Sequence, residues 1–428
     1  MTMHWGILGP GGIESVRRVR TLGLAASVRN FNELAVPGLG GVWFAKQVFL
    51  ATLGVIVAER ATARGRRVTR IGVANAIEAL ACWQSLETAA RDDRVRGSDK
   101  LAGKTVADFR FDNASRPHFY VTQPMRMACV AALPSLGLVD AAGSRFNAFT
   151  CTPDGLDFVE AACEPFRVHR VGVIEYLVRW VMGEADSINT DAMRAALSPL
   201  TPLPLEARDL LRERLQQTGG AAGSRNNRRR DALQWVQARR RGAPEASWHR
   251  KPVEISDQTH WDDMLAGARF FATQAAASAL LENIEREMPS AKDRFHISGT
   301  LSPRVLGSLA ALRLKAQIFL ELGHDEKDAN VFSREMVAGD EKDVLRRLVG
   351  RDGRILRLAG DHIIAGPAFI GAEQLDEEEA GEEAPIVADP HWPEDISYRI
   401  RNLWWLGLDL GGEMNDWLNP IAEEAPRV

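Results

Sequence analysis

The 428-residue sequence has few cysteines and lacks the closely spaced ligand pairs of a metal or disulfide framework. Four cysteines are present, and none belongs to a CxxC pair. A structural zinc site needs ligands at short, regular spacing. Each cysteine has apolar neighbours, which predicts buried free thiols in a reducing compartment. These residues are Cys82, Cys129, Cys151 and Cys163.

The motifs of common enzyme classes are also missing. The sequence has no GxSxG or HExxH pattern, and "LAGKT" at residues 101–105 lacks the upstream glycine of a phosphate-binding loop. Metal-ligand residue types gather in "HWDD" (260–263) and "GHDEKD" (323–328), but helix caps and turns explain both. We therefore predict no catalytic residue, metal, cofactor or small-molecule ligand. An enzyme whose site is assembled from dispersed residues stays open as an alternative.

Long apolar runs and a strong excess of one charge are absent as well. The most apolar stretch, Val42 to Glu59, is marginal in length for a bilayer and contains Lys46 and Gln47. We expect a buried core helix there, no membrane contact, no signal peptide and a cytoplasmic location. The net charge of −4 excludes a cationic coat for nucleic acid, but it leaves local basic patches open.

The opening glycines, in "GILGPGGIES", raise the possibility of a dinucleotide-binding domain. Gly9 and Gly11 fit that pattern, but Glu14 occupies the third small position, where close helix–strand packing needs Gly or Ala. Glu33 is the only acidic candidate for the ribose, and no alternation of strands and helices follows. We interpret these glycines as a flexible entry to a helical domain.

The stretch Tyr120 to Phe166 contains the most informative pattern. An apolar-periodic helix ends in "LGLV", a short turn leads to the alternating strand "RFNAFTCT", and "TPDG" turns that strand into the helix "LDFVEAA". This order of helix, turn, hairpin and helix is typical of the second half of a winged helix.

The stretch resembles the winged-helix modules of MarR and PadR regulators. In that family L-x-x-x-G-L-[VI] closes the recognition helix and L-T-x-x-G closes the wing. Leu133, Gly137, Leu138 and Val139 match the first signature. The second is matched by Cys151, Thr152, Pro153, Asp154 and Gly155, with a cysteine where leucine is usual. The resemblance covers about 45 residues and implies contact with duplex DNA or docking to a partner protein.

The resemblance also implies roles for individual residues. Thr122 would cap the recognition helix, and Gln123 and Arg126 would face a major groove from its N-terminal end. Arg145 and Asn147, near the hairpin tip, would reach phosphate or the minor groove. Pro134 departs from the pattern because it removes a hydrogen bond in the last turn. The residues expected to pack inward are Ala128, Val130, Ala131 and Leu133.

A basic run, "RNNRRRDALQWVQARRRG", follows a small-residue linker. Trp235 lies between its two arginine clusters, so the run has the composition of a phosphate contact with an aromatic stacking platform. A solvated linker helix explains it equally well. The arginines are Arg225, Arg228, Arg229, Arg230, Arg239, Arg240 and Arg241.

These patterns predict a mainly α, multi-domain protein with small β-hairpins and a winged-helix element. We expect four segments: a helical N-terminal domain at 1–105, the winged-helix-containing domain at 106–218, a basic linker at 219–251, and a helical C-terminal domain at 252–428 with a small hairpin and an acidic loop.

The function that we predict is that of a non-catalytic, DNA-binding or DNA-associated subunit of a bacterial cytoplasmic complex, in phage defence or DNA maintenance. Duplex DNA and other protein subunits would be its partners. The alternative is a scaffold subunit whose winged helix docks a partner protein.

Overall fold

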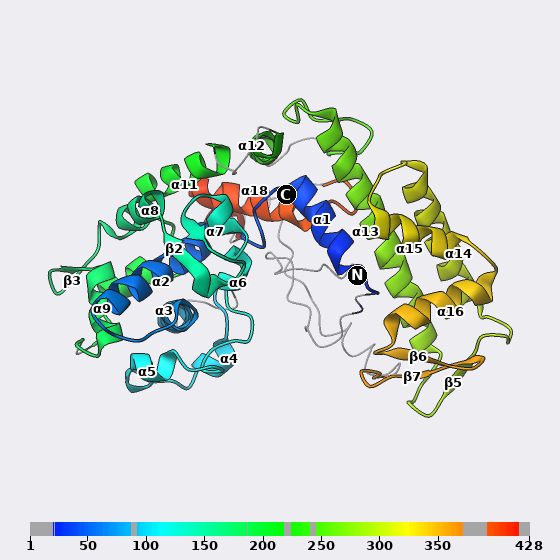
Figure 1. The fold of residues 1–428 in the computed structure, drawn as a ribbon, viewed down its shortest axis with the longest axis horizontal. Helices are drawn as coiled ribbons and strands as arrows, with labels where there is room; N and C mark the ends of the chain where they lie inside the picture. The colour runs from blue at the N-terminus through cyan, green and yellow to red at the C-terminus, as the bar shows by residue number, and fades with distance from the viewer. Residues whose placement is uncertain are drawn as a thin grey trace, which may run out of the picture. The chain divides into compact units, whose positions relative to one another are not determined.

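The computed structural model describes Arg20 and residues 22–86, 92–185, 187–217, 224–239, 245–370 and 392–418. Among these residues 59% are helical and 6% lie in small antiparallel strands, so the prediction of a mainly α fold is confirmed. The chain forms two compact units, each assembled from two separate segments (Figure 1). Unit 1 comprises Met1–Ala35 and Arg241–Tyr398, and unit 2 comprises Val36–Arg240 and Arg399–Val428.

Unit 2 therefore contains most of the predicted N-terminal domain together with the predicted winged-helix domain. Its longest helices are α2 (Ala45–Ala63), α3 (Arg70–Ser85), α12 (Ser224–Ala238) and α18 (Tyr398–Gly411). The shorter helices are α4 (Ser98–Leu101), η1 (Val106–Phe109), α5 (Phe111–Ala114), α6 (Arg126–Cys129), α7 (Ala132–Ser135), η2 (Phe146–Ala148), α8 (Pro153–Cys163), α9 (Val173–Met182), α10 (Asp191–Leu197), α11 (Leu205–Gln217) and α19 (Met414–Leu418). Two two-stranded antiparallel sheets pair β1 (Val139–Ala141) with β2 (Phe149–Cys151), and β3 (Arg167–Val168) with β4 (Val171–Gly172).

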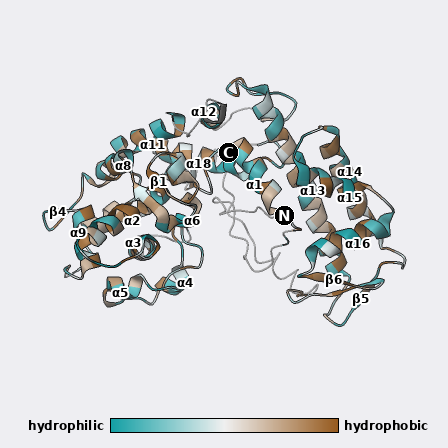
Figure 2. Cartoon of the chain, viewed as in Figure 1, coloured by the Kyte–Doolittle hydropathy of each residue, from teal (hydrophilic) through white to brown (hydrophobic). Residues whose placement is uncertain are grey.

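Helix α2 is the centre of unit 2. It contacts α3, α6, α7, α8, α9 and β2, and hydrophobic residues run along it (Figure 2). Gly54 permits the closest of these approaches, because a Cβ there would lie 2.5 Å from the Cβ of Ala74 on α3. Even Lys46 and Gln47 are buried. The Gln47 side chain accepts a hydrogen bond from the Trp43 backbone N–H at the start of the helix, so a core helix forms where the sequence predicts one.

Unit 1 is organised around α13 (Gln258–Arg286), which contacts α1, α14 and α16. The carboxylate of Asp257 and the hydroxyl of Ser302 cap α13 and α14, as polar residues at helix starts commonly do. The other elements are α1 (Ala25–Ala35), α14 (Pro303–Glu321), α15 (Lys327–Val337), α16 (Glu341–Asp352), β5 (Arg294–His296), β6 (Leu356–Ala359) and β7 (His362–Ala365). The strands form an antiparallel sheet of order β5-β7-β6, so the small hairpin predicted for the C-terminal domain is present.

One described helix, α13, is long and apolar enough to cross a membrane by length and composition, but 61% of its apolar window is buried within the protein. Its residues Phe270, Leu280 and Ile284 belong to the core of unit 1. This burial is that of a core helix.

Candidate nucleic-acid interface

The segment from Tyr120 to Phe166 forms two short helical turns, a hairpin and a longer helix. The expected recognition helix is divided into α6 and α7, with Pro134 inside α7. Strands β1 and β2 pair Val139 with Cys151 and Ala141 with Phe149. The order of elements agrees with the sequence prediction, whereas the helix before the hairpin is shorter and interrupted.

The two signatures of the segment are bonded to each other. The Thr152 hydroxyl donates to the Gly137 carbonyl over 2.7 Å, and the Thr152 backbone N–H donates to the Leu138 carbonyl over 3.2 Å. The same hydroxyl accepts from the Gly155 N–H and caps α8. A Cβ on Gly155 would lie only 2.1 Å from the Leu138 carbonyl oxygen. Thr152 and Gly155 therefore allow the start of α8 to lie against the residues that follow α7, at the base of the hairpin.

Helix α6 is capped by a residue that the sequence analysis did not identify. The carboxylate of Glu78, on α3, accepts hydrogen bonds from the backbone N–H groups of Met125 and Arg126. Glu78 is buried, and this desolvation raises the pKa of its carboxyl group, while the two backbone donors oppose the rise. The cap expected from Thr122 is absent: its side chain is exposed, and no side chain of its own segment caps α6.

Arg126 is held against α3 rather than directed to solvent. Its Nε donates to the side-chain oxygen of Asn75, and its guanidinium lies 5.6 Å from the centre of the Phe146 ring. Desolvation lowers the pKa of Arg126, and the nearby Glu78 partly offsets this shift. Gln123 is exposed, and its backbone carbonyl accepts from Arg96.

The inward-facing residues of α6 and α7 agree only in part with the periodic pattern. Ala128 and Leu133 are buried as expected, whereas Val130 is half-buried and Ala131 is exposed. The inward orientation expected of Ala131 is therefore wrong, and Val130 packs inward only in part. Met127 is also exposed, by 43%.

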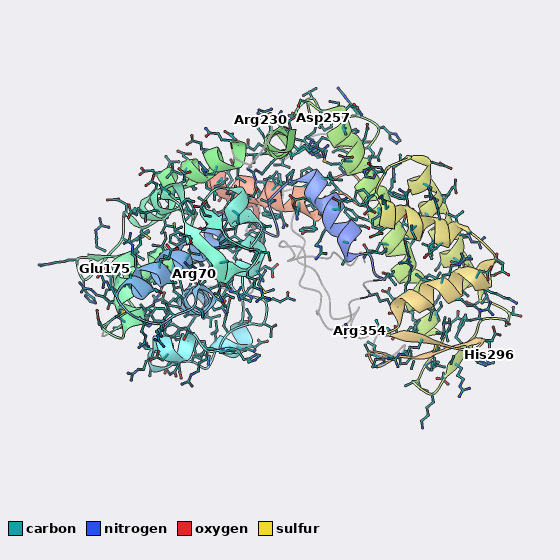
Figure 3. All side chains as sticks on the ribbon, viewed as in Figure 1. Arg70, Glu175, Arg230, Asp257, His296 and Arg354 are labelled. Carbon is teal, nitrogen blue, oxygen red and sulfur yellow. The ribbon has the colours of Figure 1, made fainter. Side chains whose placement is uncertain are left out.

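The hairpin tip is fixed to the start of α3. The side-chain oxygen of Asn147 accepts from the Ile71 backbone N–H over 2.9 Å, and the Asn147 carbonyl accepts from Arg70 over 3.1 Å. Arg70, labelled in Figure 3, also forms an ion pair with Glu59 on α2. Asn147 is thus used to position the hairpin, while Arg145, two residues earlier, is exposed.

Two further contacts bring other parts of the chain to this place. Arg66 forms an ion pair with Asp112 of α5. A Cβ on Gly72, in the first turn of α3, would lie 3.7 Å from Ser115 at the end of α5. The loop before α3 and the end of α5 therefore both adjoin the helix start to which Asn147 is bonded.

Three exposed arginines lie on the segments that meet here, and we call them the cationic edge: Arg67, Arg116 and Arg145. Each is exposed, and within the described residues none of the three has a side-chain hydrogen bond or ion pair. Sequence reasoning found Arg145 but missed Arg67 and Arg116. These two residues lie 78 and 29 positions before Arg145, and no local pattern joins the three.

The basic run has a different structure from the one expected of a phosphate-binding surface. Arg229 is only 2% exposed and donates to the Leu215 carbonyl and the Ser135 hydroxyl, which joins α12 to α11 and α7. Arg239 and Trp235 are buried too, and Arg228 is half-buried. Arg230 (Figure 3) pairs with Asp231 over 3.2 Å. The Arg225 side chain, Arg240 and Arg241 lie outside the described residues.

The two histidine-containing stretches serve packing in unit 1. The His260 Nε2 lies 2.9 Å from the Ala35 carbonyl oxygen, and the His324 Nε2 lies 3.1 Å from the Asp263 carboxylate. His324 also accepts from the Glu326 backbone N–H. No group of three or more His, Cys, Asp or Glu suited to a metal ion occurs in the described ranges.

Comparison of the chain with protein-family models, with curated proteins and with solved structures found no match.

Proposed function

We propose that this protein is a non-catalytic, DNA-associated subunit of a cytoplasmic bacterial complex, in phage defence or DNA maintenance, and that the cationic edge contacts the phosphates of duplex DNA. The observation that carries the proposal is that the segments carrying the exposed Arg67, Arg116 and Arg145 meet beside the hairpin tip. Exposed guanidinium groups form charge-assisted bonds with phosphate oxygens and displace counterions from DNA. The hairpin would then act as the wing of a winged helix does.

The proposed contact is with the sugar-phosphate backbone of the DNA more than with its bases. The exposed side chains of the α6 and α7 region include Thr122, Gln123, Met127 and Ala131, none of which is charged. Arg126, the one cation of α6, is bonded to Asn75. Phosphate contacts position a protein on a duplex, and base contacts give specificity. We therefore expect binding with weak sequence preference and strong salt dependence.

The proposal is tested by titrating the purified full chain with duplex DNA at several salt concentrations. Each phosphate contact contributes roughly −0.9 to the slope of log K against log salt concentration. Replacement of Arg67, Arg116 and Arg145 together by Gln should make that slope shallower by up to about 2.7 and weaken binding on the order of 100-fold at about 0.1 M salt.

A matched variant removes three exposed cations from unit 1, by replacing Lys292, Arg294 and Arg304 with Gln. It changes the net charge equally, so it should keep the affinity and slope of the unmodified chain. Equal losses in both variants would attribute binding to overall charge and overturn the assignment. Absence of binding at low salt would overturn the DNA proposal itself.

A protein-docking scaffold is the second candidate, favoured by the exposure of Met127 on α6. An exposed apolar side chain among uncharged neighbours suits a protein interface better than a phosphate backbone. Under this alternative Met127→Glu should abolish assembly with the partner subunit, and the cationic-edge variant should leave that assembly intact.

A further inference from the structure

A second polar site lies in unit 2, in a pocket of about 470 Å³. Its walls come from the C-terminal end of α3, from α4 and the residues after it, and from α10 with the residues before it. The side chains relevant to ligand binding are Trp83, Gln84, Lys104, Asn189 and Arg194. A volume of this size is within the range of small-molecule sites in proteins.

Gln84 lines this pocket and has an unused hydrogen-bond acceptor. The residue is 6% exposed, and its Nε2 donates to the Ile188 carbonyl and to the Asn189 side-chain oxygen, each over 3.3 Å. Its Oε1 is buried and has no hydrogen-bond partner in the described part of the protein. An unsatisfied buried acceptor destabilises the folded protein, so a ligand that supplies an N–H group there relieves that cost.

Trp83 supplies an aromatic wall in a fixed orientation. Its ring stacks on Phe109 with centroids 4.5 Å apart and an interplanar angle of 29°. Its indole N–H donates to the Lys104 carbonyl over 3.0 Å. Both contacts limit rotation of the indole, so a planar ligand meets a wall that does not have to reorganise.

Two cations give the pocket its charge preference. The Lys104 ammonium lies 4.3 Å from the centre of the Phe119 ring, an arrangement that leaves hydrogen-bond donors available. Arg194 is 44% exposed and lies 3.8 Å from Asp191, which is itself fully exposed. Such a surface pair is weak. Asp99, the acidic group among the lining residues, is exposed, so the two cations favour an anionic ligand.

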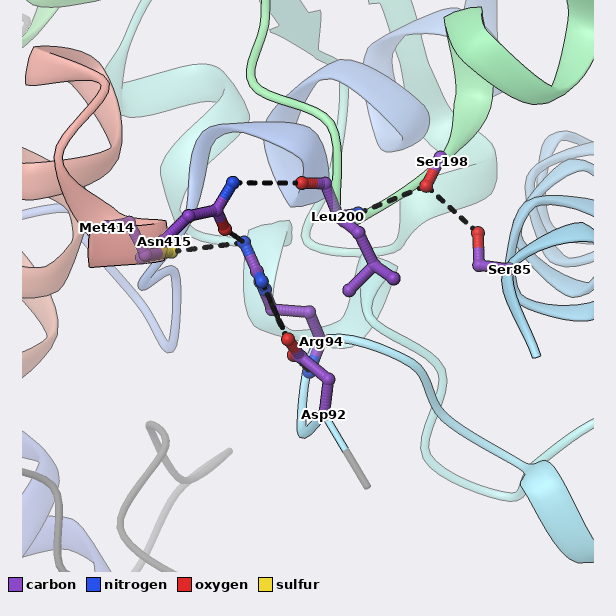
Figure 4. A network of polar contacts seen from close by, with 7 residues as sticks. All are labelled: Ser85, Asp92, Arg94, Ser198, Leu200, Met414 and Asn415. Atoms are coloured by element: carbon purple, nitrogen blue, oxygen red, sulfur yellow. Dashed lines mark hydrogen bonds and ion pairs between the residues drawn. The ribbon is translucent and has the colours of Figure 1, made fainter. Parts of the chain in front are cut away.

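A hydrogen-bond network holds the two principal walls together (Figure 4). The Ser85 hydroxyl, next to Gln84, donates to the Ser198 hydroxyl at the end of α10 over 3.0 Å. The Ser198 hydroxyl accepts from the Leu200 N–H, and the Asn415 side chain donates to the Leu200 carbonyl. Arg94 donates to Asn415 over 2.8 Å and pairs with Asp92. The spacing between the ends of α3 and α10 is therefore set without a ligand.

We propose that this pocket binds a nucleoside monophosphate. Trp83 stacks on the base, Gln84 Oε1 accepts from an N–H of the base, and Lys104 and Arg194 bind the phosphate. The ligand is either a free nucleotide or the 5′-phosphorylated end of a nucleic-acid strand. The site is separate from the cationic edge, and the proposal does not depend on the one made above for that edge.

The test is isothermal titration calorimetry of the full chain with the four ribonucleoside 5′-monophosphates, the nucleoside adenosine, inorganic phosphate and a short 5′-phosphorylated single-stranded oligonucleotide. We expect at least one monophosphate to bind at least tenfold more tightly than adenosine or phosphate. Binding of the oligonucleotide would identify a strand end as the source, and its absence would identify a free nucleotide.

Lys104→Gln and Arg194→Gln should each weaken nucleotide binding about tenfold, because a charge-assisted bond is lost. Gln84→Met should reduce the preference for the nucleotide over inorganic phosphate. Arg179→Gln, an exposed charge change on α9 of the same unit, should have no effect.

Nucleotide affinity that is unchanged in the Lys104 and Arg194 variants would overturn the proposal. So would equal affinity for phosphate and nucleotide, or binding of none of the probes. The cationic-edge variant should retain nucleotide binding, and the pocket variants should retain DNA binding, so the failure of either proposal is distinguishable from failure of the other.

Discussion

The two compact units differ in charge as well as in architecture. Unit 2 has 31 Lys and Arg against 26 Asp and Glu, whereas unit 1 has 22 against 31. The overall charge of −4 thus conceals a basic unit and an acidic one. Unit 2 contains the hairpin, the cationic edge and the pocket, and the low total charge is no obstacle to an anionic partner there.

The units also use their buried polar groups differently. In unit 2 the groups bond across the helices that support the hairpin, as Glu78 and Arg229 do. In unit 1 the buried Arg20 forms ion pairs with Glu285 and Asp352. The following substitutions probe unit 2 or provide the contrast in unit 1.

The largest effect is expected from Arg229→Leu. The change leaves the Leu215 carbonyl, the Ser135 hydroxyl and the more distant Pro37 carbonyl without a buried donor. Each such loss costs about 1–3 kcal/mol, so unit 2 should lose about 4 kcal/mol of unfolding free energy. Urea unfolding monitored by circular dichroism measures this. A variant as stable as the original chain, with weaker DNA binding, would instead assign Arg229 to a nucleic-acid contact.

Gly155→Ala should destabilise unit 2 by about 3 kcal/mol, because overpacked positions cost roughly that amount. The added Cβ would lie 2.1 Å from the Leu138 carbonyl oxygen. To relieve this clash, the start of α8 must move away from the hairpin. Differential scanning calorimetry should show the loss of stability in the unfolding transition of unit 2 only. Hydrogen exchange across residues 137–155 identifies the segment that opens, and unchanged protection there would contradict the explanation.

Glu78→Gln is expected to change the pH dependence of unit 2. Burial raises the pKa of Glu78 above its ordinary value of 4.5 in the folded state, so the folded protein binds more protons than the unfolded chain as pH rises past that value. The stability of the original chain should therefore fall relative to the variant between pH 4.5 and the higher folded pKa. At pH 4.5 the variant should be less stable by about 1 kcal/mol, since one N–H loses its acceptor. Unfolding curves at several pH values measure both effects, and parallel pH profiles would exclude a titrating Glu78.

The smallest effect, opposite in sign, is expected in unit 1. Gly307 lies within α14, and a Cβ there would meet no atom within 4 Å. Gly307→Ala should stabilise unit 1 by about 0.5–1 kcal/mol, because alanine loses less backbone entropy in a helix. A thermal scan measures the shift, and a destabilised variant would show that α14 needs the glycine for a contact.

Much of the local structure could be predicted from the sequence. The apolar stretch from Val42 to Glu59 indicated the core helix α2, and the alternation before Thr152 indicated the hairpin. These signals lie within a few residues of the structure that they specify. Even Pro134 indicated that the helix before the hairpin would be disturbed.

The candidate sites were less accessible to such reasoning. The arginine run looked like a surface for phosphate, yet Arg229 and Arg239 are buried. Thr122 is of a residue type that commonly caps helices, but Glu78, 47 positions before Met125, caps α6 instead. Whether a cation is free depends on the carbonyl and carboxyl groups that the rest of the chain brings to it, and a local pattern does not contain those groups.

The sequence by itself determined the helical class, the position of the hairpin and the glycine and threonine that close it, because backbone preferences and capping act over a single turn. Only the tertiary structure decided which arginines are exposed, which acid caps α6 and which pocket-lining residue keeps an unpaired acceptor. Those outcomes depend on partners that lie tens to hundreds of residues away and that only packing brings within hydrogen-bond distance.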